Sequence, residues 1–339
     1  MTPKERQLAA IAHKVPDRIP IDAICVENLR EIGAQLGLDY EQSMDALGID
    51  GRCVTVGPYQ GEKEPGLDEW GSSAFDDYSS NRRYPIADEE DLRRYRMPDP
   101  DCYPFADAGR AAAFYAPRYA VRGPYWKPLF CQVNSLMGME NSIISILAEP
   151  ELFEGVLEMV FAHTYRFCEN YLNACGKDLD IFYLGDDFAG QRGLLFSPEL
   201  WRKFLKPRYQ KLFELGKKHG KLVWFHSCGN ILSVLPDLIE MGVDVWETVQ
   251  LHTLPITPQE LKREYGRDIT FFGGLSTQAL PFLGPDEAAA ETRRVIEALG
   301  EGGGYIFGPD HHIKPDVSVE STRALFEAAR TFCREGWTG

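Results

Sequence analysis

The chain has 339 residues, and its 36 Lys and Arg against 51 Asp and Glu give a formal net charge of −15. Nucleic acids and anionic membranes bind basic surfaces, so this charge argues against either as a partner. Apolar residues make up 44 % of the chain, which is enough to fill a large core and excludes a mostly disordered protein.

The first twenty residues, MTPKERQLAAIAHKVPDRIP, contain neither an uninterrupted apolar stretch nor a small-residue cleavage site. Nowhere do about 18 apolar residues follow one another, as a membrane-spanning helix requires. The eight cysteines are scattered without a CxxC pair, a pattern typical of reduced thiols. We therefore expect a soluble, cytoplasmic protein.

The predicted elements begin with a strand at 17–25 (DRIPIDAIC). Residues 51–127 follow, and they are rich in Pro, Gly, Tyr, Asp and Arg and show little periodicity. We interpret this stretch as a long insertion after the first strand that caps one end of the domain. Its aromatic residues Trp70, Tyr78 and Tyr84 are candidates for closing over a bound ring.

From about residue 128 onward, a short apolar run, a polar loop and an amphipathic helix recur in that order. The runs are continuously apolar, as in buried parallel strands, and lie at 128–135, 178–187, 221–227, 243–250, 268–276 and 303–310. The helices are expected at 197–220, 230–242, 257–266, 284–303 and 317–332. In the first of these, Ser197 is placed as N-cap and Pro207 predicts a kink.

Six strand–helix units and the early strand come close to the eight of a closed parallel barrel. The expected fold is therefore α/β, a (β/α)8 TIM barrel that spans 1–339 as one domain, with 51–127 as a capping insertion. An open doubly wound sheet is the alternative. No GxGxxG segment opens a helix in this chain, so the dinucleotide site usual in that alternative has no support.

Two polar clusters follow predicted strands and carry metal-binding side chains. His226 and Cys228 lie in HSCGN at 226–230, and His311 and His312 lie in PDHHI at 309–313. The strand ends of a parallel barrel meet at one mouth. His226, Cys228 and His311 thus supply three donors and leave open the fourth position of a catalytic zinc. His312 is an equal candidate by chemistry alone, and a small core Cys228 beside a hydrogen-bonded His226 is the non-metal alternative.

Acidic and amide side chains follow two further strands. Asp186 and Asp187 end one strand, and because neighbours in an extended chain point oppositely, we expect only one of them to face the mouth. Glu247 ends another strand and is a candidate to orient or complete a metal site, or to donate a proton. The remaining candidates, for substrate binding, are Gln191, Arg192 and Gln250.

The residues from Asp186 to Gln250, together with FGGLSTQ (272–278) and GGYIFGPDHHIKPDVSVES (303–321), resemble the uroporphyrinogen decarboxylase superfamily. The match extends over roughly 120–335, and the resemblance implies a (β/α)8 barrel. The true decarboxylases carry an N-terminal R-Q-A-G-R-Y motif that clamps substrate acetates. The corresponding segment here, IDAICVENLREIG (21–33), lacks that arginine pair, which disfavours porphyrinogen decarboxylation.

Within the superfamily, a His-x-Cys pair at this position is similar to that of the corrinoid-dependent methyltransferases. In several of them the pair binds zinc together with a later Cys, whose place is taken here by His311. The resemblance implies a zinc-dependent methyltransferase that moves a methyl group between a small methoxylated or methylated compound and a corrinoid. The corrinoid is expected on a partner protein, because this chain has no Asp-x-His-x-x-Gly segment.

In this interpretation Asp187 or Glu247 protonates or orients the substrate, and Gln250 forms a hydrogen bond with it. The alternative is a metal-free decarboxylase of a tetrapyrrole or smaller carboxylate, with Asp187 stabilising a protonated pyrrole and Arg192 clamping a carboxylate. A third, non-enzymatic alternative is a chaperone that only binds a corrinoid or tetrapyrrole.

Overall fold

The computed structural model describes residues 1–73 and 82–335, so Tyr78 lies outside the described residues. Its main sheet is parallel and has the order β1-β2-β3-β6-β7-β8-β9. The strands are β1 (Gly51–Cys53), β2 (Ala120–Pro124), β3 (Ile181–Gly185), β6 (Leu222–His226), β7 (Val245–Val249), β8 (Thr270–Leu275) and β9 (Tyr305–Pro309). A separate antiparallel pair consists of β4 (Ala189–Gly190) and β5 (Gly193–Leu194).

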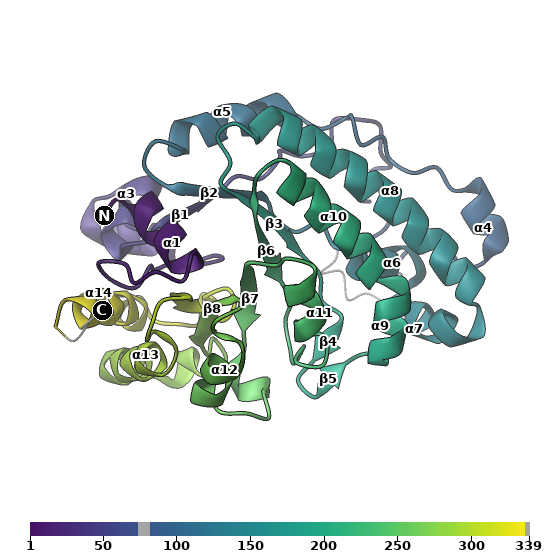
Figure 1. Ribbon diagram of the computed structural model, residues 1–339. Helices are drawn as coiled ribbons and strands as arrows, with labels where there is room; N and C mark the ends of the chain where they lie inside the picture. The colour runs from purple at the N-terminus through teal and green to yellow at the C-terminus, as the bar shows by residue number, and fades with distance from the viewer. Residues whose placement is uncertain (74–81, 336–339) are drawn as a thin grey trace.

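Hydrogen bonds through the segment around Ile21 join the two edges of the curled sheet. Ile21 forms a parallel bridge with Phe307 of β9. The backbone N–H of Asp50, next to β1, donates to the carbonyl of Ile21 at 2.7 Å. The segment thus occupies the eighth position, although it is too short to count as a regular strand. Figure 1 shows the sheet in the middle of the molecule with helices outside it, which confirms the predicted parallel α/β architecture.

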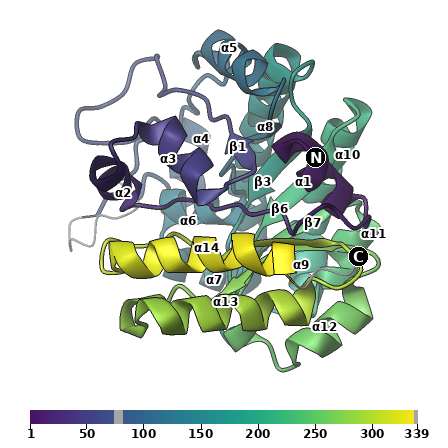
Figure 2. The same ribbon diagram turned by 90° about the vertical axis from the view of Figure 1, so that its left-hand side faces the viewer.

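The helices cover the outer face of the sheet. In chain order they are α1 (Pro3–Ile11), α2 (Leu29–Leu36), α3 (Tyr40–Leu47), α4 (Glu89–Arg94), α5 (Phe105–Tyr115), α6 (Phe130–Met137), α7 (Met139–Ala148), α8 (Pro150–Cys175), α9 (Pro198–Phe204), α10 (Lys206–Lys218), α11 (Leu235–Glu240), α12 (Pro258–Tyr265), α13 (Pro285–Leu299) and α14 (Val319–Glu335). Figure 2 shows α13 and α14 side by side near the N-terminal helix α1.

Local sequence accounts for several helix boundaries. Ser197 is the N-cap of α9, and its hydroxyl accepts a hydrogen bond from the N–H of Leu200 at 3.3 Å. Thr257 and Glu260 form a capping box at the start of α12. The helix predicted at 197–220 is divided at Leu205, just before Pro207, into α9 and α10. The kink predicted from Pro207 is thus found as a division into two helices, since a proline inside a helix removes one backbone hydrogen bond.

The strand predicted at 128–135 is wrong, because residues Phe130–Met137 form α6. Hydrogen bonds to the carboxylate of Asp186 explain why this segment begins a helix. Its Oδ2 accepts from the N–H of Phe130 at 2.6 Å, and its Oδ1 accepts from that of Cys131 at 2.9 Å. These N–H groups have no partner within a helix, and a tertiary contact satisfies them here. Sequence periodicity over eight residues could not reveal that contact.

The stretch 51–127 is not entirely an insertion, because β1 and β2 of the main sheet lie at its two ends. The residues between these strands pack largely on α8. The ring of Trp70 lies 4.4 Å from that of His163, and the ring of Tyr103 lies 4.8 Å from that of Phe167, both on α8. Trp70 is therefore part of the core, while Tyr84 is 39 % exposed.

Candidate functional site

His226, Cys228 and His311 lie together at the carboxyl ends of β6 and β9. One ligand atom from each residue can be chosen so that all three lie within 4.8 Å of one another. Zinc binds nitrogen at about 2.0 Å and sulfur at about 2.3 Å in a tetrahedral shell. Ligand atoms at these distances in a tetrahedron lie about 3.3 to 3.6 Å apart, so the three side chains must move inward by about an ångström to hold one ion. Within the described ranges 1–73 and 82–335, this trio is the metal-ligand group found, and His312 is not part of it.

Glu247 on β7 orients His226. Its Oε1 lies 2.8 Å from His226 Nδ1, and its Oε2 accepts from Trp224 Nε1 at 2.5 Å. The hydroxyl of Tyr183 also donates to Oε1. The carboxylate is fully buried, and its contacts turn Nε2 of His226 toward Cys228, whose Sγ lies 3.5 Å away. Metal-binding histidines are commonly held by such a carboxylate, so Glu247 is a positioning residue.

The two neighbouring aspartates have different roles, as expected from their alternation. Asp186 is fully buried and holds α6, and it also accepts from the hydroxyl of Tyr209 at 2.5 Å. Asp187 is partly exposed, with its Oδ1 3.7 Å from His226 Nε2. The same oxygen accepts from the backbone N–H of Cys228 at 2.8 Å. Asp187 is therefore the aspartate that faces the centre, beside its candidate ligands.

The buried carboxylate of Glu247 favours a positive charge at His226, which either a proton or a metal ion at Nε2 can supply. Burial lowers the pKa of His226, but hydrogen bonds to Cys228 and Glu247 outweigh burial and raise that pKa well above its ordinary value. Burial raises the pKa of Glu247, yet the contact with His226 brings it below its ordinary value. Burial and the charges of His226 and His312 lower the pKa of His311 to about 4. The neutral imidazole of His311 has the lone pair that a metal ligand needs.

A cavity of about 370 Å³ adjoins the centre. It is lined by His312, whose ring lies 4.7 Å from that of His311, and by Tyr183, whose hydroxyl donates to Glu247. The ring of Trp126, just after β2, lies 5.3 Å from the ring of His226. The centre thus has a wall and an adjoining space for a small molecule.

None of the three predicted substrate-binding residues lines this cavity. Gln191 and Arg192 are exposed in the turn between β4 and β5 and do not line it. Gln250 holds the loop after β6, since its Oε1 accepts from the N–H of Gly229 at 2.7 Å.

Sequence reasoning missed several residues that build the site, because they lie inside strands or loops without a distinguishing motif. Trp126 follows a strand that was not predicted. Tyr183 and Trp224 lie within the apolar runs of β3 and β6. The hydroxyl of Tyr183 and Nε1 of Trp224 both donate hydrogen bonds to Glu247. Side chains alternate between the two faces along each strand, and this alternation places Tyr183, Trp224 and Glu247 on the same face of the sheet. That pattern is the signal that could have identified them.

The fold is a curled parallel α/β sheet whose edges are joined by the segment around Ile21. A His/Cys/His cluster and a cavity lie at the carboxyl ends of its strands. These features define a class of barrel-like α/β proteins with a candidate metal centre. Residues 80–332 match the family model described as uroporphyrinogen decarboxylase (URO-D). The chain therefore belongs to the uroporphyrinogen decarboxylase family, and the resemblance stated from its sequence is confirmed.

The relatives include two kinds of enzyme. A uroporphyrinogen decarboxylase of Coxiella burnetii is 24 % identical over 270 residues, which is 74 % of this chain and 69 % of that protein. A methylcobamide:CoM methyltransferase of Methanosarcina barkeri is 24 % identical over 196 residues, which is 58 % of this chain and 53 % of that protein. A methyltransferase from Methanosarcina mazei has the same fold, with a TM-score of 0.70 at 18 % identity over 98 % of this chain and 99 % of that chain.

No helix among the described residues is both long and apolar enough to span a bilayer.

Proposed function

We propose that this chain is a cytoplasmic, zinc-dependent methyltransferase. It moves a methyl group between a small methoxylated or methylated compound and a corrinoid carried by a partner protein. The methyltransferases among its relatives support the reaction class. The observation that carries the proposal is the convergence of His226, Cys228 and His311 beside a substrate-sized cavity.

The residues present fit a zinc ion. Two imidazoles and one thiol are ligands that zinc prefers, and three protein ligands leave the fourth position to substrate. The Glu247–His226 contact supplies the outer support typical of such sites. The chemistry that zinc supplies when bound is polarisation of the methyl-bearing oxygen or sulfur, which lowers the pKa of the departing alcohol or thiol.

The chain's own side chains have separate tasks in this proposal. Glu247 holds His226 in one orientation, and Gln250 fixes the loop that carries Cys228. Asp187 is the partly exposed carboxylate beside the candidate ligands, so it is placed to exchange a proton with the substrate heteroatom. When the methyl group passes to the corrinoid, that heteroatom keeps the bonding electron pair and is protonated. Trp126 excludes water from one side of the centre.

The test combines metal analysis with a transfer assay. Purified protein is expected to hold about one zinc per chain, and His226→Ala and Cys228→Ser are expected to lose it while keeping the fold by circular dichroism. Methoxylated aromatics and methylated thiols are then screened with a reduced corrinoid protein. Zinc content that is low and unchanged by both substitutions contradicts the metal site. Conversion of a porphyrinogen without corrinoid supports the metal-free decarboxylase in place of the methyltransferase.

A further inference from the structure

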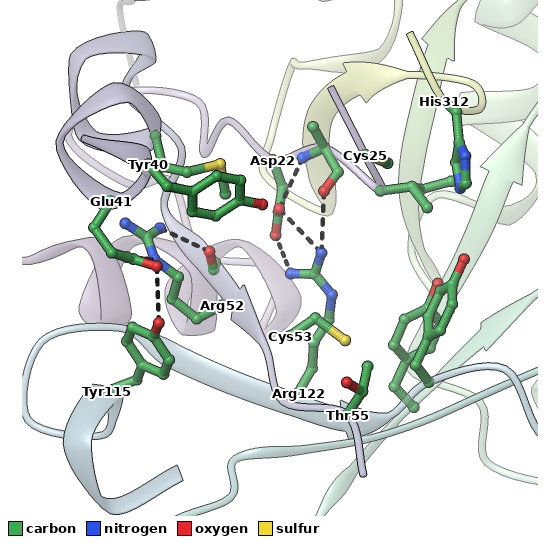
Figure 3. Close-up of a pocket in the computed structure, with 16 residues that line it drawn as sticks. Asp22, Cys25, Tyr40, Glu41, Arg52, Cys53, Thr55, Tyr115, Arg122 and His312 are labelled. Carbon is green, nitrogen blue, oxygen red and sulfur yellow. Dashed lines mark hydrogen bonds and ion pairs between the residues drawn. The ribbon is translucent and has the colours of Figure 1, made fainter. Parts of the chain in front are cut away.

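The cavity beside the candidate metal centre has an aromatic wall and contains no unpaired arginine or lysine among the described residues. Figure 3 shows two pairs of its polar side chains turned toward each other, Arg122 with Asp22 and Tyr115 with Glu41. Tyr115, Tyr125 and Tyr183 contribute rings to the lining, with Tyr40 at its more exposed edge. Such rings bury flat apolar molecules efficiently.

The first cation of the lining, Arg122 on β2, is neutralised by Asp22. Arg122 Nη1 donates to Asp22 Oδ2 at 2.5 Å and Arg122 Nη2 donates to Asp22 Oδ1 at 3.1 Å, a two-point pair. Both side chains are almost completely buried. Gln7 Nε2 also donates to Asp22 Oδ2 at 2.8 Å. Breaking a buried pair of this kind costs several kcal/mol, so an incoming anion cannot easily take Arg122 from its partner.

The second cation, Arg52 on β1, is held by two carboxylates. Arg52 Nε donates to Glu41 Oε2 at 2.9 Å, and Arg52 Nη2 donates to Asp45 Oδ1 at 2.8 Å. The guanidinium also lies 3.9 Å from the centre of the Tyr119 ring. Glu41 itself accepts a second hydrogen bond from Tyr115 at 2.8 Å (Figure 3). Arg52 is thus fully occupied in holding α3 against β1.

The two thiols of the lining add no charge, because burial raises the pKa of Cys53 to about 12 and also raises that of Cys25. An anionic substituent placed at the arginine end of this cavity, away from His312 and the candidate metal centre, therefore meets no free counter-charge. It would have to lose its hydration without compensation, which is costly.

Building on the proposed function, we propose that the substrate is an uncharged methoxylated aromatic compound. The cavity then discriminates against anionic substrates, such as aromatic carboxylates and thiols that carry a sulfonate group. The neutralised arginines are the residues that determine this specificity.

The test compares two ligands of nearly equal size, vanillamide and vanillate, which differ in an amide against a carboxylate. Binding to the whole chain is measured by isothermal titration calorimetry. We expect vanillamide to bind at least about tenfold more tightly than vanillate. Equal binding, or tighter binding of vanillate, overturns the inference. Tight vanillamide binding without any methyl transfer to a corrinoid contradicts the proposed function and leaves the inference intact.

Two sets of variants locate the binding and its cause. Met44→Trp and Thr55→Trp each fill the cavity and should abolish vanillamide binding, whereas Met97→Trp, a solvent-exposed control outside the cavity, should not. Asp22→Asn uncovers the charge of Arg122 and should shift the preference toward vanillate by about tenfold. Vanillamide binding that survives both cavity-filling variants, or a folded Asp22→Asn chain with unchanged preference, contradicts the proposal.

Discussion

The buried carboxylate of Glu247 offers the sharpest test of how the candidate metal centre is built. It receives hydrogen bonds from Trp224 and Tyr183 and contacts Nδ1 of His226. In Glu247→Gln, one of the two oxygens becomes an NH2 group. If this group faces Trp224, two donors meet at 2.5 Å, and if the amide is reversed, it faces both His226 and Tyr183. Either orientation leaves a donor facing a donor.

We expect this substitution to weaken zinc binding by tenfold to a hundredfold, which corresponds to about 1.4 to 2.8 kcal/mol. The physical reason is that His226 keeps its acceptor only if the amide NH2 group is forced against the N–H of Trp224, while all three ligands remain. Adding Trp224→Phe should recover part of the loss, because the amide can then turn its NH2 group toward the phenylalanine and its oxygen toward His226.

Zinc affinity is measured by competition with a chromophoric chelator, with circular dichroism as the check on folding. Glu291→Gln is the matched control, because Glu291 pairs with Arg294 at the surface of α13, away from the centre. A folded Glu247→Gln chain whose zinc affinity equals that of the control would refute the positioning role.

Three further predictions concern stability. Asp186→Ala leaves buried N–H groups at the start of α6 without their acceptor. The free energy of unfolding, measured by urea denaturation, should therefore fall by about 3 kcal/mol or more. A smaller decrease than that caused by Asp187→Ala would contradict the role assigned to Asp186. Burial and the charge of Lys127 lower the pKa of His163 from 6.5 to about 3. As the pH drops, His163 is therefore protonated in the unfolded chain before it is protonated in the folded chain. The free energy of unfolding should fall by about 1.4 kcal/mol per pH unit between pH 6.5 and 3. His163→Phe should flatten that part of the pH profile, and an unchanged slope would count against it. Thr257→Ala removes the capping box of α12 and should cost about 1 kcal/mol in thermal or urea unfolding, whereas no measurable change would show that tertiary contacts alone hold this helix end.

The sequence alone determined which strands carry the candidate metal ligands. Continuous apolar runs at β3, β6, β7, β8 and β9 identify buried parallel strands, and such strands end at one mouth. The sequence therefore predicted that Cys228 and His311 lie close together, although 83 positions separate them in the chain. Backbone alternation likewise separated Asp187 from Asp186. These conclusions depend on short-range patterns and on the single geometry of a parallel barrel.

Tertiary structure alone decided what depends on contacts between distant segments. The apolar run at α6 is helical because Asp186, more than fifty residues later, accepts its N-terminal N–H groups. The charge of Arg122 is cancelled by Asp22, 100 residues earlier, so the polarity of the cavity is not evident from either residue alone. Periodicity records which face of an element is buried, but it does not record which partner each polar group meets there.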